Sequence, residues 1–185
     1  WEDRPEEEQV ILALVLAALS MRGQSTTDEP GAVLEIEVAG GEVKAEGPVL
    51  LHVTLANRGS QPLWLNERLG LNNPFAPPSH RELTLSVVGP DGRNLRFAAF
   101  VNRDSARAKD FCVLPPTEAI SRTLDLANYY TFDQEGVYTV RARYADGSPK
   151  FPPAPDGVIP FKGPLRSNEV QIHVGQLALA VGRRL

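Results

Sequence analysis

The sequence predicts a mainly β protein, an antiparallel β-sandwich of immunoglobulin-like type with one N-terminal apolar α-helix. Apolar and polar residues alternate with a period of two in many short segments. Turn-forming residues, and no helical patterns, separate those segments, which favours antiparallel sheets over a parallel α/β sheet. The composition agrees, because 15 Gly and 16 Pro residues among 185 favour turns and loops over long helices.

The alternating segments lie within residues 32–175, which we assign to one β-sandwich domain. In the first of them Leu34, Ile36 and Val38 share one face and glutamates occupy the other. A Gly-Pro-Asp-Gly turn at 89–92 predicts that 94–97 returns as a hairpin strand. The other expected strands are 49–57, 62–65, 82–88, 120–126, 137–144 and 169–174.

One local motif supports the immunoglobulin-like type. Gly136 and Tyr138 form a Gly-x-Tyr element at the start of a late strand. This is the pattern of a tyrosine corner, in which the phenol hydroxyl bonds back to the preceding loop. We therefore expect the Tyr138 hydroxyl to contact backbone a few residues upstream.

Residues 1–23 form a separate segment, the N-terminal apolar helix. Asp3 can cap its start and Gly23 can end it. The run from Val10 to Leu19 is apolar on every face, unlike a surface helix. A secretory signal normally starts with basic residues, whereas the residues before Val10 are Glu-rich. A membrane span needs about 20 apolar residues, which is more than this run contains. A helix buried against a partner or against the domain itself is therefore our leading interpretation, with signal and anchor as alternatives.

Two long loops, at 66–81 and 148–166, interrupt the predicted strands. The second contains six prolines, which make a loop stiff and extended. Loops of this length often bind a ligand or partner. They can equally be ordered excursions that cover an open sheet edge. Residues 176–185 form a short apolar and then basic tail.

Several residue patterns resemble a known family. They are Asp110-Phe111-x-x-Leu114, Ile120 to Leu126, Tyr130, Gly136 to Arg141, and Gly163-Pro-Leu165-x-Ser167-Asn168-x-Val170-x-Ile172. Together they are similar to the non-catalytic β-sandwich of deuterolysin-like (peptidyl-Lys) zinc metallopeptidases and to related lone domains of secreted bacterial proteins. The resemblance covers residues 47–174 and implies a fold and an exported, periplasmic or extracellular location. It implies no reaction, because the chain lacks the His-Glu-x-x-His element of the catalytic domain.

The residues predict no enzyme, no metal site and no cofactor. His52 and His173 fall at outward strand positions, and His80 lies in a Pro-rich loop. Cys112 sits among apolar residues and is expected to be a small buried hydrophobe. A calcium site at the pairs Asp125/Asp133 and Asp104/Asp110 is disfavoured, because turn capping is the usual use of such Asp side chains.

We predict a non-enzymatic interaction module. The expected partner is a protein or another copy of the chain, and the docking residues are Ile11, Leu14, Val15 and Leu19. The alternative is an exported accessory or carbohydrate-binding domain whose apolar run is a signal or membrane anchor. In that case the N-terminal helix would associate with the membrane. Its ligand face would contain Trp64, Tyr129 and Tyr130. The net charge of −4 argues against nucleic-acid binding.

Overall fold

The structure is a computed structural model that describes residues 31–40, 43, 47–75, 77, 81–99, 106–145, 152–161 and 163–175. Within these residues the chain is mainly β, with short 3-10 turns as its helical elements. In chain order the elements are β1 (Ala32–Val38), β2 (Leu50–Asn57), β3 (Leu63–Asn66), β4 (Leu83–Val88), η2 (Ala108–Asp110), β5 (Phe111–Leu114), β6 (Ala119–Asp125), η3 (Leu126–Asn128), β7 (Gly136–Tyr144), β8 (Ile159–Pro160) and β9 (Leu165–Val174).

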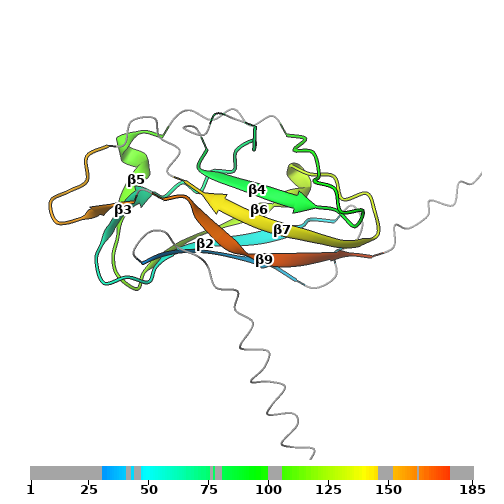
Figure 1. Ribbon diagram of the computed structural model, residues 1–185, viewed down its shortest axis with the longest axis horizontal. Helices are drawn as coiled ribbons and strands as arrows, with labels where there is room; N and C mark the ends of the chain where they lie inside the picture. The colour runs from blue at the N-terminus through cyan, green and yellow to red at the C-terminus, as the bar shows by residue number, and fades with distance from the viewer. Residues whose placement is uncertain are drawn as a thin grey trace, which may run out of the picture.

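The strands form three sheets with the orders β1-β2-β6, β4-β7-β9 and β5-β3-β8. The strands of the first two sheets pair antiparallel with one another, and in the third sheet β8 pairs in parallel with β3. Figure 1 shows the β4-β7-β9 sheet lying over β2 and β6, while β3 and β5 extend to one end of the molecule. The predicted mainly β, antiparallel architecture is confirmed.

The core lies between the β1-β2-β6 and β4-β7-β9 sheets and includes residues of the β5-β3-β8 sheet. Strands β1, β4 and β7 contribute the apolar half of their alternating patterns, so that burial in them follows the period of two. In β1, for example, Leu34 and Ile36 are buried while Glu35 and Glu37 are exposed. Removing these apolar side chains from water is the main driving force for packing the two sheets. The largest fully buried side chains are Tyr138, Tyr144, Phe161, Leu34, Leu51, Leu55, Leu63, Leu65, Leu69, Leu71, Leu83 and Leu126.

A bend at Asn57 joins the third sheet to the first. The pairs β2–β6 and β3–β5 are two halves of one antiparallel ribbon, because β3 follows β2 and β6 follows β5. Asn57 is fully buried at the bend. Its Nδ2 donates to the carbonyls of Gln61 and Leu114 at 2.8 and 2.9 Å, and its Oδ1 accepts from Gly59 N at 3.0 Å. The side chain therefore pairs backbone groups that the bend removes from the ladder.

A β-bulge in β9 positions a side chain that links the β4-β7-β9 sheet to strand β1 of the β1-β2-β6 sheet. The register shifts opposite Ala142, where Ser167 Oγ accepts from Ala142 N at 2.8 Å. The bulge aims the Asn168 side chain at β1. Asn168 Oδ1 accepts from Ile36 N at 2.8 Å, and Asn168 Nδ2 donates to Ile36 O at 2.9 Å. One amide side chain thus pairs both backbone groups of Ile36 at the β1 edge.

The predicted tyrosine corner is confirmed. Tyr138 Oη donates to Gln134 O at 2.9 Å and accepts from Gln134 N at 3.0 Å. Gly136 has φ of 136°, and a Cβ there would lie 2.9 Å from the Pro90 ring. Only glycine avoids both the strained backbone and the clash. The Gly-x-Tyr spacing is therefore a structural requirement of this corner.

Both long loops contain segments that cover sheet edges. Residues 159–160 form β8, where Ile159 N donates to Pro62 O at 3.0 Å and Phe161 N donates to Trp64 O at 2.9 Å. In the other loop, residues 70–72 lie along β4, and Leu83 exchanges backbone hydrogen bonds with them. For these segments the edge-covering interpretation holds.

Three details of the sequence prediction are corrected. Residues 94–97 form no strand, because only Asn94 bridges β4, at Val88, and Leu95 N adds one bond to Val87 O at 2.8 Å. The short strands β5 and β8 were not predicted. Four and two residues are too few to display an alternating pattern.

The predicted helix of 1–23 and the tail of 176–185 lie outside the described residues. Among the residues that are described, no helix has the length and apolar character needed to cross a membrane.

Asn57→Ala is expected to lower the free energy of unfolding by about 3 kcal/mol, because it leaves buried backbone groups without partners. Asn73→Ala is the matched control, since Asn73 makes one exposed turn bond, to Phe75 N. The control should cost less than about 1 kcal/mol. Urea unfolding of both variants measures the difference, and equal losses would contradict a special role for the bend.

Candidate functional site

The structure places Trp64 of the predicted ligand face against its own sheet. Its indole Nε1 donates to Pro152 O at 3.1 Å, and its ring centroid lies 5.8 Å from that of Phe111. The side chain is only partly exposed. It therefore anchors the Pro-rich segment that leads to β8.

The two tyrosines of that predicted face pack elsewhere, on Phe97. Tyr129 stacks on the Phe97 ring at 5.8 Å, and Tyr130 meets it edge-on at 5.5 Å. Tyr130 is 3% exposed and donates to Leu85 O at 3.2 Å, and burial raises its pKa far above the usual range. The expectation that Tyr130 belongs to an exposed aromatic face is therefore wrong. Trp64 and the tyrosines have separate neighbours and form no common platform.

The predicted docking residues Ile11, Leu14, Val15 and Leu19 lie outside the described residues. Their role stays a prediction from the sequence.

The remaining polar candidates occupy structural positions. His52 and His173 are exposed, as predicted, and His52 Nδ1 lies 2.7 Å from Thr123 Oγ1. Asp125 caps a turn, because its Oδ1 accepts from the backbone N of Val49 and of Ala127. Across the described segments no three His, Cys, Asp or Glu side chains group in a way that could hold a metal ion.

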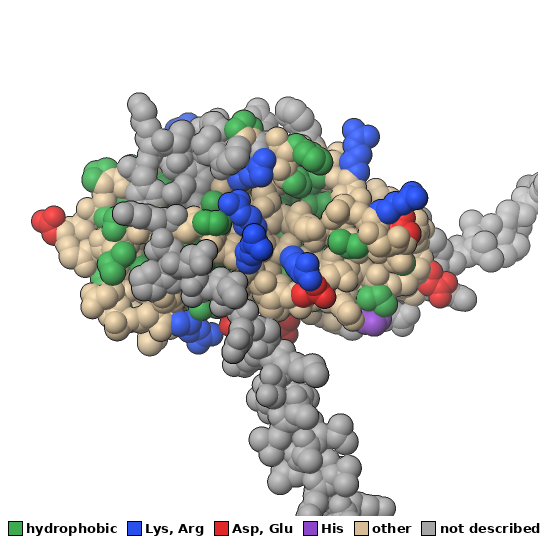
Figure 2. Space-filling view, in the orientation of Figure 1, with side chains coloured by type: hydrophobic (Ala, Val, Ile, Leu, Met, Phe, Trp, Pro, Cys, Tyr) green, Lys and Arg blue, Asp and Glu red, His purple; other side chains and the backbone are tan. Residues whose placement is uncertain are grey.

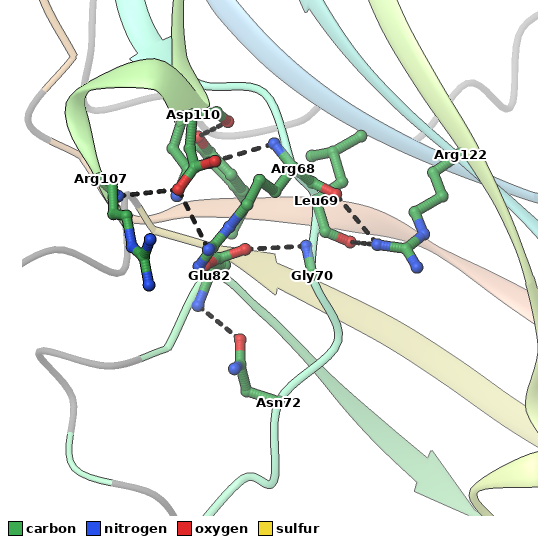
Figure 3. Close-up of polar contacts among 10 residues, drawn as sticks. Arg68, Leu69, Gly70, Asn72, Glu82, Arg107, Asp110 and Arg122 are labelled. Atoms are coloured by element: carbon green, nitrogen blue, oxygen red, sulfur yellow. Dashed lines mark hydrogen bonds and ion pairs between the residues drawn. The ribbon is translucent and has the colours of Figure 1, made fainter. Parts of the chain in front are cut away.

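A buried ionic cluster, which sequence analysis did not find, lies where β3, β4 and β5 meet (Figure 3). Arg68 pairs with Glu82 and, at 3.2 Å, with Asp110. Glu82 is 2% exposed, and its Oε2 accepts from Gly70 N at 3.0 Å. Asp110 Oδ2 also accepts from Arg107 N at 2.8 Å. Each carboxylate thus accepts from a backbone N–H as well as from Arg68, which offsets the cost of removing these charges from water.

The same cluster fixes the path of the chain after β3. Arg122 of β6 donates to the carbonyls of Arg68 and Leu69 at 3.0 and 3.4 Å. Leu69 adopts a positive φ of 45°, which a non-glycine residue holds only when its surroundings enforce it. Figure 3 shows Arg122 and Glu82 reaching this segment from opposite sides. No local pattern could reveal the cluster, because its members come from distant parts of the sequence.

Cys112 is half-buried beside Glu67. Burial raises the pKa of its thiol to about 11, and the negative charge and hydrogen bond of Glu67 contribute to the rise. The thiolate, which is the reactive form, is therefore scarce at neutral pH. This agrees with the interpretation of Cys112 as an unreactive packing residue.

A hollow of about 360 Å³ lies at the tyrosine corner. Its lining includes Tyr138, Asp91, Asp133 and Arg93. Asp91 Oδ1 accepts from Arg93 N at 3.0 Å, so this carboxylate shapes the turn. Burial and the carboxylates of Asp133 and Asp91 raise the pKa of Tyr138, against the lowering effect of its backbone hydrogen bond. The lining of the hollow therefore combines the neutral hydroxyl of Tyr138 with the acidic Asp91 and Asp133 and the basic Arg93.

The edge of β4 is covered along its length by other parts of the chain. Alternate residues of an edge strand direct their N–H and C=O groups outward. In β4 these groups belong to Leu83, Leu85 and Val87. Their partners are Gly70 O and Asn72 N at Leu83, the Tyr130 hydroxyl at Leu85, and Leu95 N at Val87.

The outer edge of β6 differs from that of β4 in the partners of its backbone groups. Leu126 N donates to Val49 O at 2.7 Å, which fixes the alternation: even-numbered residues of β6 face β2 and odd-numbered ones face outward. Over the described part of the chain the structure records no backbone partner on the outward side. We define the β6 edge as the outward backbone groups of Ala119, Ser121, Thr123 and Asp125.

No family model matches the chain, and no curated protein matches it. A similar solved structure is the CARDB domain of a Pyrococcus furiosus protein, in complex with di-metal ions. It is 14% identical, with a TM-score of 0.39, over 82% of this chain and 99% of that one. The structure itself shows a β-rich fold, and the resemblance to deuterolysin-like domains stays a prediction from the sequence.

Alkylation of Cys112 by iodoacetamide should follow a pH–rate profile with its midpoint near pH 11. Glu67→Gln removes a negative neighbour that favours the neutral thiol, so it should move the midpoint to lower pH. The chain has one cysteine, so mass spectrometry reads a single reaction. A wild-type midpoint near about 8.5, the value for an ordinary cysteine, would contradict the buried thiol.

Proposed function

We propose that the chain is a non-catalytic β-sandwich module that acts by binding other proteins. The observation that carries this proposal is the β6 edge. An uncovered strand edge is a template on which another strand can add, because its backbone groups need hydrogen-bond partners. Parts of other edges are covered by β8, by residues 70–72 or by Asn168, whereas the described residues provide no backbone partner for the outward groups of β6.

The use of the buried charges supports a binding role over a catalytic one. A catalytic acid or base needs a free position facing a substrate. Glu82 and Asp110 instead hold Arg68 and backbone N–H groups. Asp125 likewise caps a turn.

The strand orders β1-β2-β6 and β4-β7-β9, together with the Tyr138 corner, support the immunoglobulin-like type within this proposal. Domains of this type commonly serve recognition, which is an argument from fold alone.

Docking through the N-terminal apolar helix remains part of the proposal. Its support is the unbroken apolar run from Val10 to Leu19 in the sequence. The periplasmic or extracellular location also rests on the sequence, through the alternative in which this run is an export signal.

The test takes a second copy as the partner, because an antiparallel edge can pair with itself. Ser121→Pro removes an outward N–H without breaking the ladder to β2, whereas Ser121→Ala removes only the hydroxyl that contacts Thr54. We expect the full chain to self-associate in light scattering, and Ser121→Pro, but not Ser121→Ala, to lower the measured mass.

A chain lacking residues 1–23 completes the test. Loss of association in this variant, with its melting temperature unchanged, would assign docking to the helix. A chain that is monomeric at every concentration, or a mass that neither change alters, would contradict the proposal.

A further inference from the structure

Two residues of opposite charge lie at the β6 edge, Glu118 just before the strand and Arg122 within it. On the face of the molecule shown in Figure 2, acidic side chains lie beside several basic ones, and Arg141 pairs with Glu169 across β7 and β9. Glu118 differs from these, because it is exposed and has no ion-pair partner among the described residues. Its carboxylate can therefore accept from a donor on a second molecule.

Arg122 has donors that its contacts within the described residues do not use. The side chain is only partly exposed, and its hydrogen bonds to Arg68 O and Leu69 O both come from Nη1. Figure 3 shows the other guanidinium nitrogens of Arg122 turned away from these two carbonyls. Since a guanidinium group carries five N–H donors, Nη2 can bind a carboxylate while Nη1 keeps its present bonds.

The alternation of β6 decides which groups can meet a second copy of the strand. Odd-numbered residues direct their backbone groups outward, and even-numbered ones direct their side chains toward the core side of the sheet. Glu118 keeps this alternation, because its carbonyl accepts from Asn57 N at 2.9 Å in line with the β2–β6 ladder. Glu118, Ile120 and Arg122 therefore share one side of the strand.

The charges distinguish the registers in which two copies of β6 can pair. Two identical strands related by a two-fold axis run antiparallel, and the axis places one residue opposite itself. An axis at Arg122 sets like charges opposite each other, and an axis at Ser121 or Thr123 sets Arg122 opposite an apolar side chain. An axis at Ile120 instead sets Arg122 of each copy opposite Glu118 of the other.

We propose that β6 pairs with β6 of a second copy about a two-fold axis at Ile120. This inference rests on the proposed function, since it uses the β6 edge, and it adds the partner's identity and the register. Ala119 of each copy exchanges both backbone hydrogen bonds with Ser121 of the other. The even-numbered side chains approach most closely, so that Ile120 meets its own copy between two Arg122–Glu118 ion pairs. The β1-β2-β6 sheets of the two copies then form one continuous sheet.

Oxidative cross-linking of single cysteines measures the register. Each variant carries Cys112→Ser, which removes the one native thiol, together with Ile120→Cys, Ser121→Cys or Thr123→Cys. In the proposed register the two Ile120 Cα atoms lie about 4.5 Å apart, within the reach of a disulfide. The Ser121 Cα atoms lie about 9 Å apart and the Thr123 Cα atoms about 20 Å apart, which is too far. On non-reducing gels we expect a linked dimer from Ile120→Cys and none from the other two.

Glu118→Arg tests the ion pairs. It replaces both Arg122–Glu118 contacts by contacts between two arginines, so the dissociation constant of the dimer should rise at least about tenfold. Glu37→Arg is the control, because it makes the same charge change at an exposed position of β1, which β2 separates from β6. In sedimentation equilibrium the control should stay within about twofold of the unchanged chain. Equal weakening in both variants would overturn the proposed register.

The outcomes separate this register from the proposed function. If Ser121→Pro abolishes self-association but Ile120→Cys gives no linked dimer, the β6 edge binds a second copy in another register, and only the present inference is wrong. A linked dimer from Ser121→Cys or Thr123→Cys would identify that other register. If the unchanged chain does not self-associate, or Ser121→Pro leaves its mass unaltered, the role of the β6 edge and the register fail together.

Discussion

Backbone groups at a bend in a β-ribbon lose their ladder partners, and they must find others before the bend can be buried. At the junction of β2 with β3 a single amide side chain supplies them. Asn57 serves Gln61, Leu114 and Gly59 at once, in a position closed to water. The third sheet can therefore continue the ribbon without opening a gap in the core. The segments that pack on that sheet, including β8 and the chain around Arg68, depend on this junction.

Side chains also supply hydrogen-bond partners for backbone groups at the sheet edges. Asn168 occupies both backbone groups of Ile36, and the Tyr130 hydroxyl occupies Leu85 O, so side chains replace missing strands. In the segment that follows β3, Gly70 N donates to Glu82, and Glu82 and Asp110 both pair with Arg68. The β6 edge is different, since the described residues provide no backbone partner for its outward groups. The proposed function starts from this departure from a self-satisfied structure.

How far the sequence predicts this structure depends on how local each feature is. The longer strands and the Tyr138 corner follow from residues within one segment, since side-chain alternation and the Gly-x-Tyr spacing are local. Strands β5 and β8 exist only because β3 lies beside them, and no pattern within them shows it. The ring of Tyr130 is buried because Phe97 and β4 come to it from elsewhere in the chain. The ionic cluster around Arg68 is equally non-local, and tertiary contacts decide such features.

Because Asn57 pairs the backbone groups at the bend, we expect the two halves of the ribbon to open as one cooperative unit. Native-state hydrogen exchange measures the opening free energies of the Leu65 amide in β3 and the Val53 amide in β2. We expect equal values in the unchanged chain, both matching global unfolding, because neither half opens alone. A Leu65 amide that exchanges at a much lower free energy than Val53 would show that the third sheet opens independently and that Asn57 does not couple the two halves.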